Sequence, residues 1–305
     1  MSSTVIDQAA LHDLDSAVCS DGAPSARNLL VTVFGDVVVP AGPETEVSVQ
    51  GLTSVLADFG VNERLVRTSL TRLVNDDLLT VRSSGRRSSY RVAPTAIDLF
   101  AAADERIYRG RPDPWDGHWT LVVLDGAEST PERRAMLRQE LVATGLGVVA
   151  PNVLASPVVT PAIVADTVTR VGGFEQVLVT RSTVVPGAGL ADPVALARRC
   201  VDLGEIEERY DALADRFAGF DDQMLGGLGD VRASKLRLLV VSTFRRVVLA
   251  DPWLPRELLP PAWAGDRARR EAARVYAAVA PRADHRLAML LAHPVDTAPD
   301  RFTPV

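Results

Sequence analysis

The stretch from Ser48 to Val92 restricts the possible folds more than any other part of the chain, because its hydrophobic period changes along it. Apolar residues recur at helical spacing after Ser48 and again after Asn62, with a short turn at Gly60 between the two runs. Serine and asparagine cap helices, and glycine supplies the left-handed residue that ends one. The period then falls to two, which is typical of strands. Two helices joined by a tight turn and followed by a hairpin predict a winged helix-turn-helix.

The second of these predicted helices, which starts after Asn62, has an apolar face and a polar face. Val66, Leu70 and Leu73 form the apolar face. The other face follows the i, i+3, i+4, i+7, i+11 spacing and contains Arg64, Arg67, Thr68, Thr71 and Asn75. Such a helix fits the DNA major groove, where arginine binds phosphate or the two acceptors of guanine. Arg72 lies round the helix from this face, so we expect it to contact the sugar-phosphate backbone.

The predicted hairpin has a basic tip, and the charge of this whole segment is opposite to that of the chain. Between Asn62 and Val92 there are seven arginines and three acidic residues, a net charge of +4, whereas the whole chain carries −6. A DNA-binding site in an acidic protein must show such a local reversal. An ordinary solvated surface is the alternative. We predict that these residues bind double-stranded DNA: Arg64, Arg67, Thr68, Thr71, Arg72, Arg82, Arg86 and Arg87.

The chain as a whole is predicted to be an α+β protein with several domains. Residues 1–24 are polar and acidic, and we interpret them as a flexible arm. Residues 25–112 are predicted to form the winged helix-turn-helix domain, which begins with a helix at Ser25 and ends with a linker helix. Residues 113–190 are predicted to form a central ferredoxin-like α/β domain, and residues 191–305 a mostly α-helical C-terminal domain.

Alternating strands and helices lead to the ferredoxin-like prediction. The expected elements of the central domain are a strand at 119–125, a helix at 131–145, a strand at 148–157, a helix at 161–172 and a strand at 175–185. Long helical patterns follow, and the expected C-terminal helices are 193–217, 231–249 and 267–280.

Composition argues against several classes of protein. No run of about 18 apolar residues is available to span a membrane, and the N-terminus lacks the order of a signal peptide, so we expect a cytoplasmic protein with no membrane partner. Cys19 and Cys200 are too few for a disulfide framework. The four histidines lack metal-ligand spacing, and no G-x-S-x-G or P-loop motif occurs. We expect no metal, no cofactor and no enzymatic activity.

Four phrases lie in a fixed order along the chain. They are VRTSLTRLVNDDLL (66–79), GRRSSYRV (85–92), WDGHW (115–119) and FRRVVLADPWLPRELLPPAWAG (244–265). In these phrases, and along nearly its whole length, the chain resembles the PaaX family of bacterial transcription regulators. The resemblance implies a homodimeric repressor with a winged-helix head, a central domain similar to the Cas2 nucleases and a helical C-terminal domain. It also implies an operator-DNA partner and an aryl-acyl-CoA effector, such as phenylacetyl-CoA, that releases the operator.

Asp125 provides the one enzymatic alternative. It follows the first strand of the central domain, where Cas2-like nucleases hold a metal-binding carboxylate, and a Cas2-like metal-dependent nuclease is therefore the alternative function. An Asp-Gly pair after a strand also forms a simple turn, which needs no metal.

The residues that bind the effector stay unknown at this point, because each candidate has two interpretations. Four tryptophans would either line a pocket for an aryl group or anchor the packing of the domains. They are Trp115, Trp119, Trp253 and Trp263. Arg245 and Arg246 would either bind the phosphates of a CoA group or pair with acids on neighbouring helices.

Overall fold

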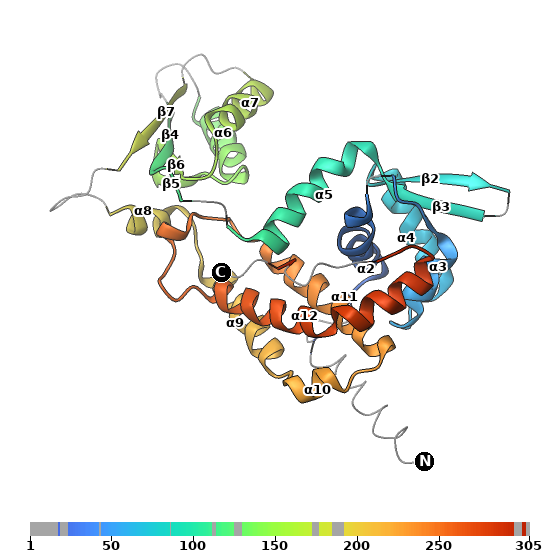
Figure 1. Ribbon diagram of the computed structural model, residues 1–305. Helices are drawn as coiled ribbons and strands as arrows, with labels where there is room; N and C mark the ends of the chain where they lie inside the picture. The colour runs from blue at the N-terminus through green and yellow to red at the C-terminus, as the bar shows by residue number, and fades with distance from the viewer. Residues whose placement is uncertain are drawn as a thin grey trace. The chain divides into compact units, whose positions relative to one another are not determined.

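The computed structural model describes residue 18 and residues 24–42, 44–85, 87–111, 114–124, 130–172, 177–184, 192–295 and 301–302. The chain divides into two compact units (Figure 1). Unit 1 contains the described residues of Met1–Gly110, Glu208–Ala250 and Ala264–Val305, and unit 2 contains those of Arg111–Glu207 and Asp251–Trp263. Within these ranges no helix has both the length and the apolar character needed to cross a membrane. The predicted arm at 1–24, apart from Val18 and Pro24, lies outside the described residues.

Three helices form the part of unit 1 that we call the head: α2 (Ala26–Val33), α3 (Val49–Ala57) and α4 (Glu63–Asn75). Helix α2 continues as a π-helical turn, η1 (Phe34–Val38), and a short 3-10 turn, η2 (Val39–Ala41). Each of the three helices begins at a side chain that accepts a backbone N–H bond, and the acceptors are Ser25, Ser48 and Asn62. The predicted caps at Ser48 and Asn62 are confirmed, and Gly60 adopts the expected left-handed conformation with φ 72°.

A three-stranded antiparallel sheet follows α4, with β2 (Leu79–Ser84) and β3 (Arg87–Val92) as the predicted hairpin. The third strand, β1 (Val47–Ser48), pairs with β3 and gives the order β1-β3-β2. Sequence periodicity did not predict β1, because two residues before a helix cap are too few to show a period. Figure 1 shows that the hairpin extends away from the helices of its unit.

The linker after the hairpin is helical, as predicted. A 3-10 turn, η3 (Pro94–Ala96), leads into α5 (Ile97–Asp104) and then a π-helical turn, η4 (Glu105–Arg109). Gly110 ends this run with φ 90°, and unit 1 gives way to unit 2 after it.

The C-terminal helices also belong to unit 1. They are α10 (Asp222–Gly226), α11 (Asp230–Val248), α12 (Ala264–Leu291) and the part of α9 (Gly204–Ala218) from Glu208 onward. Helix α11 contacts α12 and α2, and α12 contacts α3. The core of the head therefore includes residues from α11 and α12, among them Leu238, Leu287 and Leu291. Parts of the predicted segments 25–112 and 191–305 thus share one compact unit.

Two predicted helix ends in this region were wrong. The helix predicted at 267–280 continues through Pro281 as far as Leu291, because the residues around the proline, such as Ala283 and Leu287, are fully buried and packing compensates for the lost backbone bond. The helix predicted at 193–217 is instead α8 (Pro193–Cys200) followed by α9, because Val201 has extended backbone angles that end the first helix.

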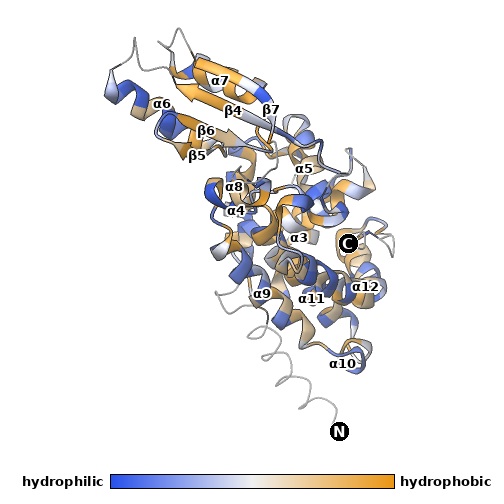
Figure 2. Ribbon diagram, turned by 90° about the vertical axis from the view of Figure 1, so that its left-hand side faces the viewer, coloured by the Kyte–Doolittle hydropathy of each residue, from blue (hydrophilic) through white to orange (hydrophobic). Residues whose placement is uncertain are grey.

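Unit 2 contains a four-stranded antiparallel sheet in the order β5-β6-β4-β7. Its elements run along the chain as β4 (His118–Leu124), α6 (Pro131–Ala143), β5 (Gly147–Ala150), β6 (Val153–Ser156), α7 (Pro161–Val171) and β7 (Val177–Thr183). This βαββαβ order and sheet topology are ferredoxin-like, as predicted. Strand β4 is hydrophobic along most of its length (Figure 2). Leu137 and Leu141 of α6 and Val164 of α7 share one core with Val122 and Leu154 of the sheet.

The strand predicted at 148–157 is a hairpin of two strands, β5 and β6. Pro151 and Asn152 form the turn between them, and the register is irregular between Val148 and Ala150. Proline has no N–H for a sheet bond and asparagine favours turns, so the chain reverses at this point. The uninterrupted apolar character of both strands concealed the turn.

Candidate nucleic-acid interface

Helix α4 presents its polar face to solvent. Val66, Leu70 and Leu73 are buried, as predicted. The predicted contact residues on the other sides of the helix are all exposed: Arg64, Arg67, Thr68, Thr71 and Arg72. The sidedness of the helix is therefore confirmed, whereas the DNA contacts themselves stay a prediction.

Local hydrogen bonds fix several side chains on this face. The hydroxyls of Thr68 and Thr71 donate to the carbonyls of Arg64 and Arg67 at 2.9 and 3.0 Å. Their lone pairs and methyl groups remain available to a ligand. Arg67 forms an ion pair with Glu63, one turn earlier, at 2.7 Å. Arg64 and Arg72 form no ion pair with any carboxylate among the described residues. These two arginines of α4 can therefore bind DNA without first breaking an ion pair.

The hairpin carries Arg82 in β2 and Arg87 at the start of β3, and both are exposed. Arg86 at the tip lies outside the described residues. Arg87 has no ion pair with a described carboxylate. Arg82 lies 3.7 Å from Glu46. Of the two predicted DNA-binding arginines in the described part of the hairpin, Arg87 is therefore the one without a nearby described carboxylate.

The segment before α3 supplies acids to the base of the hairpin, which the sequence analysis did not predict. Glu44 pairs with Arg91, and Glu46 accepts a 2.6 Å bond from the Ser89 hydroxyl. The bond from Ser89, together with the charge of Arg82, holds the pKa of Glu46 below its usual value. The positive charge of the segment is therefore concentrated on α4 and near the hairpin tip. The sequence of residues 40–46 did not indicate these contacts with the hairpin, because its only evident feature is that it breaks a helix.

The end of α4 fixes how the chain turns into the hairpin. Asp77 has φ 55°, in the left-handed region, and its N–H bonds to the Val74 carbonyl at 3.1 Å. The N–H of Leu78 bonds to the Leu73 carbonyl at 3.0 Å, which completes a Schellman motif. Asp76 at the same helix end pairs with Arg27 of α2 at 2.7 Å. These contacts set the direction of the hairpin relative to α4.

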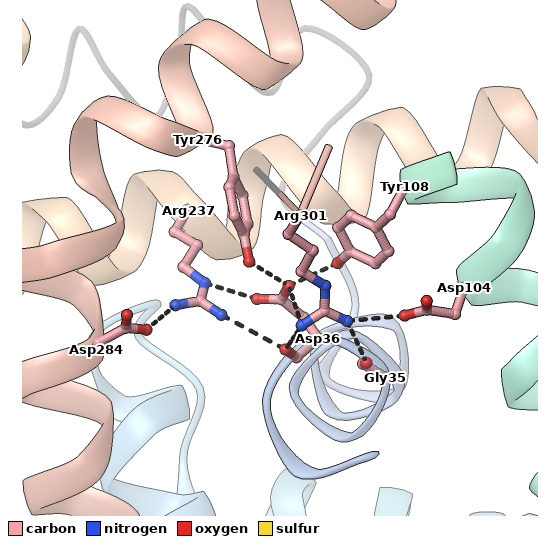
Figure 3. A network of polar contacts seen from close by, with 8 residues as sticks. All are labelled: Gly35, Asp36, Asp104, Tyr108, Arg237, Tyr276, Asp284 and Arg301. Carbon is pink, nitrogen blue, oxygen red and sulfur yellow. Dashed lines mark hydrogen bonds and ion pairs between the residues drawn. The ribbon is translucent and has the colours of Figure 1, made fainter. Parts of the chain in front are cut away.

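A buried polar network holds the head on the rest of unit 1. Figure 3 shows Asp36, in the η1 turn that follows α2, enclosed by side chains from the linker and the C-terminal segments. Its carboxylate accepts bonds from Tyr108 at 2.6 Å, Tyr276 at 2.9 Å and Arg237 at 2.7 Å. Arg301 donates to the Asp36 carbonyl at 2.6 Å. The side chains of Asp36 and Arg237 are fully buried, so this ion pair is shielded from water.

Each of the two arginines in this network also has a second acidic partner. Arg237 also pairs with Asp284, and Arg301 pairs with Asp104 at 2.8 Å. Burial alone would raise the pKa of Asp36, but Arg237 and Arg301 outweigh it and the pKa lies below its ordinary value. Burial and the Asp36 charge raise the pKa of Tyr108 well above its usual value, so its hydroxyl stays a donor. The only sign of this network in the sequence is a single carboxylate within the apolar run LLVTVFGDVVV.

The other candidate residues from the sequence include the four tryptophans and Asp125. Trp119 and Trp263 are buried, and Trp115 meets the Trp119 ring edge-on at a centroid distance of 6.0 Å. Trp253 has the Arg111 guanidinium over its ring at 4.7 Å. These contacts within unit 2 are packing contacts. Asp125 lies outside the described residues, and those that are described contain no cluster of metal-ligating side chains.

Among the described residues, Arg245 and Arg246 do not pair with acids on neighbouring helices, and their binding to a CoA group stays a prediction. They line two separate cavities of unit 1.

Comparison with known proteins gives the family. The chain is 31% identical over 262 residues to the transcriptional repressor PaaX of Escherichia coli (strain K12), with 85% of this chain and 82% of that protein covered. The chain belongs to the PaaX family. Three PaaX family models match in order: the PaaX-like protein model at residues 25–96, the PaaX protein central Cas2-like domain at 112–193, and the PaaX-like protein C-terminal domain at 201–289.

A solved structure has the same fold. The chain matches the uncharacterized protein Rv0674 from Mycobacterium tuberculosis with a TM-score of 0.54 and 24% sequence identity, over 86% of this chain and 98% of that one. Helix α4 and the hairpin lie within the first PaaX family match, and the sheet of unit 2 lies within the Cas2-like match.

Proposed function

We propose that this protein is a transcriptional repressor that binds double-stranded operator DNA through a winged helix-turn-helix. The observation that carries the proposal is the exposed cationic face of α4, on which Arg64 has no partner among the described carboxylates. Membership of the PaaX family supports it, because a relative identical at 31% of positions is named a transcriptional repressor.

In this proposal α4 enters the major groove. Arg64, Arg67, Thr68 and Thr71 contact base edges and nearby phosphates, and the free cation of Arg64 requires no rearrangement. Arg72 binds the sugar-phosphate backbone and fixes the register. The hairpin is the wing, from which Arg82, Arg86 and Arg87 contact the adjacent backbone or groove.

Regulation in this proposal requires two copies and an effector. A homodimer places two recognition helices on half-sites about one helical turn apart. An aryl-acyl-CoA, such as phenylacetyl-CoA, binds the conformation in which the two helices no longer match those half-sites. A tenfold to hundredfold release of DNA needs only about 1.4–2.8 kcal/mol of coupling free energy.

The proposal is tested by the affinity of the full-length protein for a duplex from the region upstream of its own gene, against an unrelated duplex of equal length. We expect tight binding of the upstream duplex alone, with no added divalent metal. If about five arginines of each subunit contact phosphates, the slope of log affinity against log salt is about −4.5 per subunit. Equal affinity for both duplexes would contradict the proposal. Metal-dependent cleavage of either duplex would favour the nuclease.

A further inference from the structure

A cavity of about 260 Å³ lies in unit 1 between α2, the α5 linker and α11. Most of its wall is apolar, with Val31, Phe100, Ile107 and Val241 among the lining residues. Leu99 also lines it and is 60% exposed, so the cavity opens to solvent along α5. An apolar cavity of about 150 Å³ takes up benzene. This cavity is therefore large enough for one ring or a short acyl chain together with a polar group.

Arg245 is the lining residue whose charge is not offset. Its Nε is buried and has no hydrogen-bond partner among the described residues, and no described carboxylate forms an ion pair with it. The other charges of the wall are matched. Asp36 is bound by Arg237 and two tyrosines, and Asp104 by Arg301. Burial lowers the pKa of Arg245, as expected for a guanidinium without an adjacent anion.

We propose that this cavity binds a small organic acid, whose ring or short chain fills the apolar part and whose carboxylate pairs with Arg245. A carboxylate supplies both the missing acceptor for Nε and the missing negative charge. A neutral thioester carbonyl supplies only the acceptor and leaves the charge of Arg245 unmatched. The proposed ligand is therefore a free acid, which makes this site chemically different from one for an acyl-CoA.

The position of the cavity links it to DNA binding, and this step rests on the proposed function. Arg27 lines the cavity and also holds Asp76 at the end of α4. A ligand in the cavity presses on α2, which carries Arg27 and packs against α4. Because such coupling is reciprocal, the acid lowers DNA affinity and DNA lowers acid affinity by the same factor.

Isothermal titration of the full-length protein with benzoate, 3-phenylpropionate and hexanoate tests the site without DNA. The controls are 3-phenylpropionamide, which is neutral and of similar shape, and 3-phenylpropionyl-CoA. We expect at least one acid to bind, and the amide to bind at least tenfold more weakly than its acid. Arg245→Met is expected to weaken acid binding at least tenfold. Arg246→Met, one residue along α11 and in the other cavity, is expected to change it less than twofold.

A second variant separates loss of the site from loss of the fold. Ala103 lines the cavity, so Ala103→Phe is expected to fill it and abolish acid binding while thermal unfolding stays as cooperative as in wild type. The proposal is overturned if no acid binds, if acid and amide bind equally, if only the CoA thioester binds, or if Arg245→Met binds the acid as wild type does.

DNA affinity without acid is measured in parallel. Tight DNA binding with no acid binding would support the repressor proposal and overturn the acid site. Acid binding that depends on Arg245, without DNA binding, would support the acid site and overturn the repressor proposal.

Discussion

Asp36 is the residue on which the attachment of the head most depends. The Asp36→Asn variant keeps the shape of the side chain but removes the fully buried partner of Arg237, which then has only its pair with the more exposed Asp284. Removal of one member of a buried ion pair destabilises a protein by about 3–5 kcal/mol. We expect a decrease of that size in the free energy of unfolding at pH 7, measured with urea. Glu140→Gln, which removes a partly exposed pair with Arg170, is the control and is expected to cost less than about 1 kcal/mol.

The pH dependence of the same variant has a definite sign. The folded-state pKa of Asp36 is lowered, so its contribution to stability is fully present above the unfolded-state pKa of about 4 and is lost as pH falls through the lower, folded-state value. The difference between wild type and Asp36→Asn is therefore expected to be constant from pH 7 to about 5 and to shrink below about 4. A difference that grows as the solution is acidified would contradict this account.

Glu63 restrains an arginine of the proposed DNA-binding face. Glu63→Gln frees Arg67 and removes a negative charge from that face. Exposed ion pairs of this kind contribute about 0.2–1 kcal/mol, so DNA affinity is expected to rise by a factor of about 1.4 to 5. Fluorescence anisotropy with a labelled upstream duplex measures the change. An affinity that falls would show that Glu63 itself assists binding.

The residue pattern predicted which face of α4 is buried and which is exposed, but it did not predict the ion pairs formed at the neighbouring hairpin. Helical spacing alone fixes that Val66 lies inward and Arg64 outward. The pairing of Glu44 with Arg91 and of Glu46 with Arg82 depends on where the segment before α3 lies beside the hairpin. Such a contact between distant segments leaves no trace in a local period.

Helix α3 packs closely against α12 at Gly51. A Cβ on Gly51 would lie 2.6 Å from the Leu290 carbonyl oxygen and 3.2 Å from the Leu291 Cα, and both of these atoms belong to the backbone of α12. Gly51→Ala is therefore expected to separate α3 from α12 and to lower the free energy of unfolding by about 1–3 kcal/mol, despite the higher helix propensity of alanine. Gly226→Ala in α10 is the matched control, because nothing lies within 4 Å of its added Cβ. Equal stability of the two variants in urea titrations would contradict the close contact.

Sequence predicted the existence of most elements better than their ends. The caps at Ser48 and Asn62 are local chemistry and were predicted correctly. The continuation of α12 through Pro281 depends on packing of the residues around it, which a local rule for proline cannot include. The β5–β6 turn at Pro151 was missed because both strands are apolar.

On the scale of the whole molecule, the head shares its core with the C-terminal helices. Leu238, Leu287 and Leu291 belong to the same cluster as Leu52 and Leu70. A fragment of residues 25–112 would expose the apolar residues that these helices cover. We expect it to lack the cooperative thermal unfolding of the full-length chain and to bind a hydrophobic dye. A cooperative transition at the midpoint of the full-length protein would contradict this prediction.

Family resemblance and periodicity together predicted the ferredoxin-like sheet and the helical C-terminal region. Neither predicted that α11 and α12 would pack with the head, because the apolar faces of separate helices do not specify their partners. The cavity beside Arg245 follows from the same packing, since its wall comes from α2, α5 and α11.

The most direct test of the central claim is the affinity of Arg64→Ala for the upstream duplex, compared with Arg170→Ala. Arg64 lies on the exposed face of α4, and Arg170 is an exposed arginine of α7 in unit 2. A good arginine contact in the major groove is worth about 1–3 kcal/mol, so Arg64→Ala is expected to weaken binding about fivefold or more. Arg170→Ala is expected to stay within twofold of wild type. Equal affinities for the two variants would mean that the basic face of α4 is only a solvated surface.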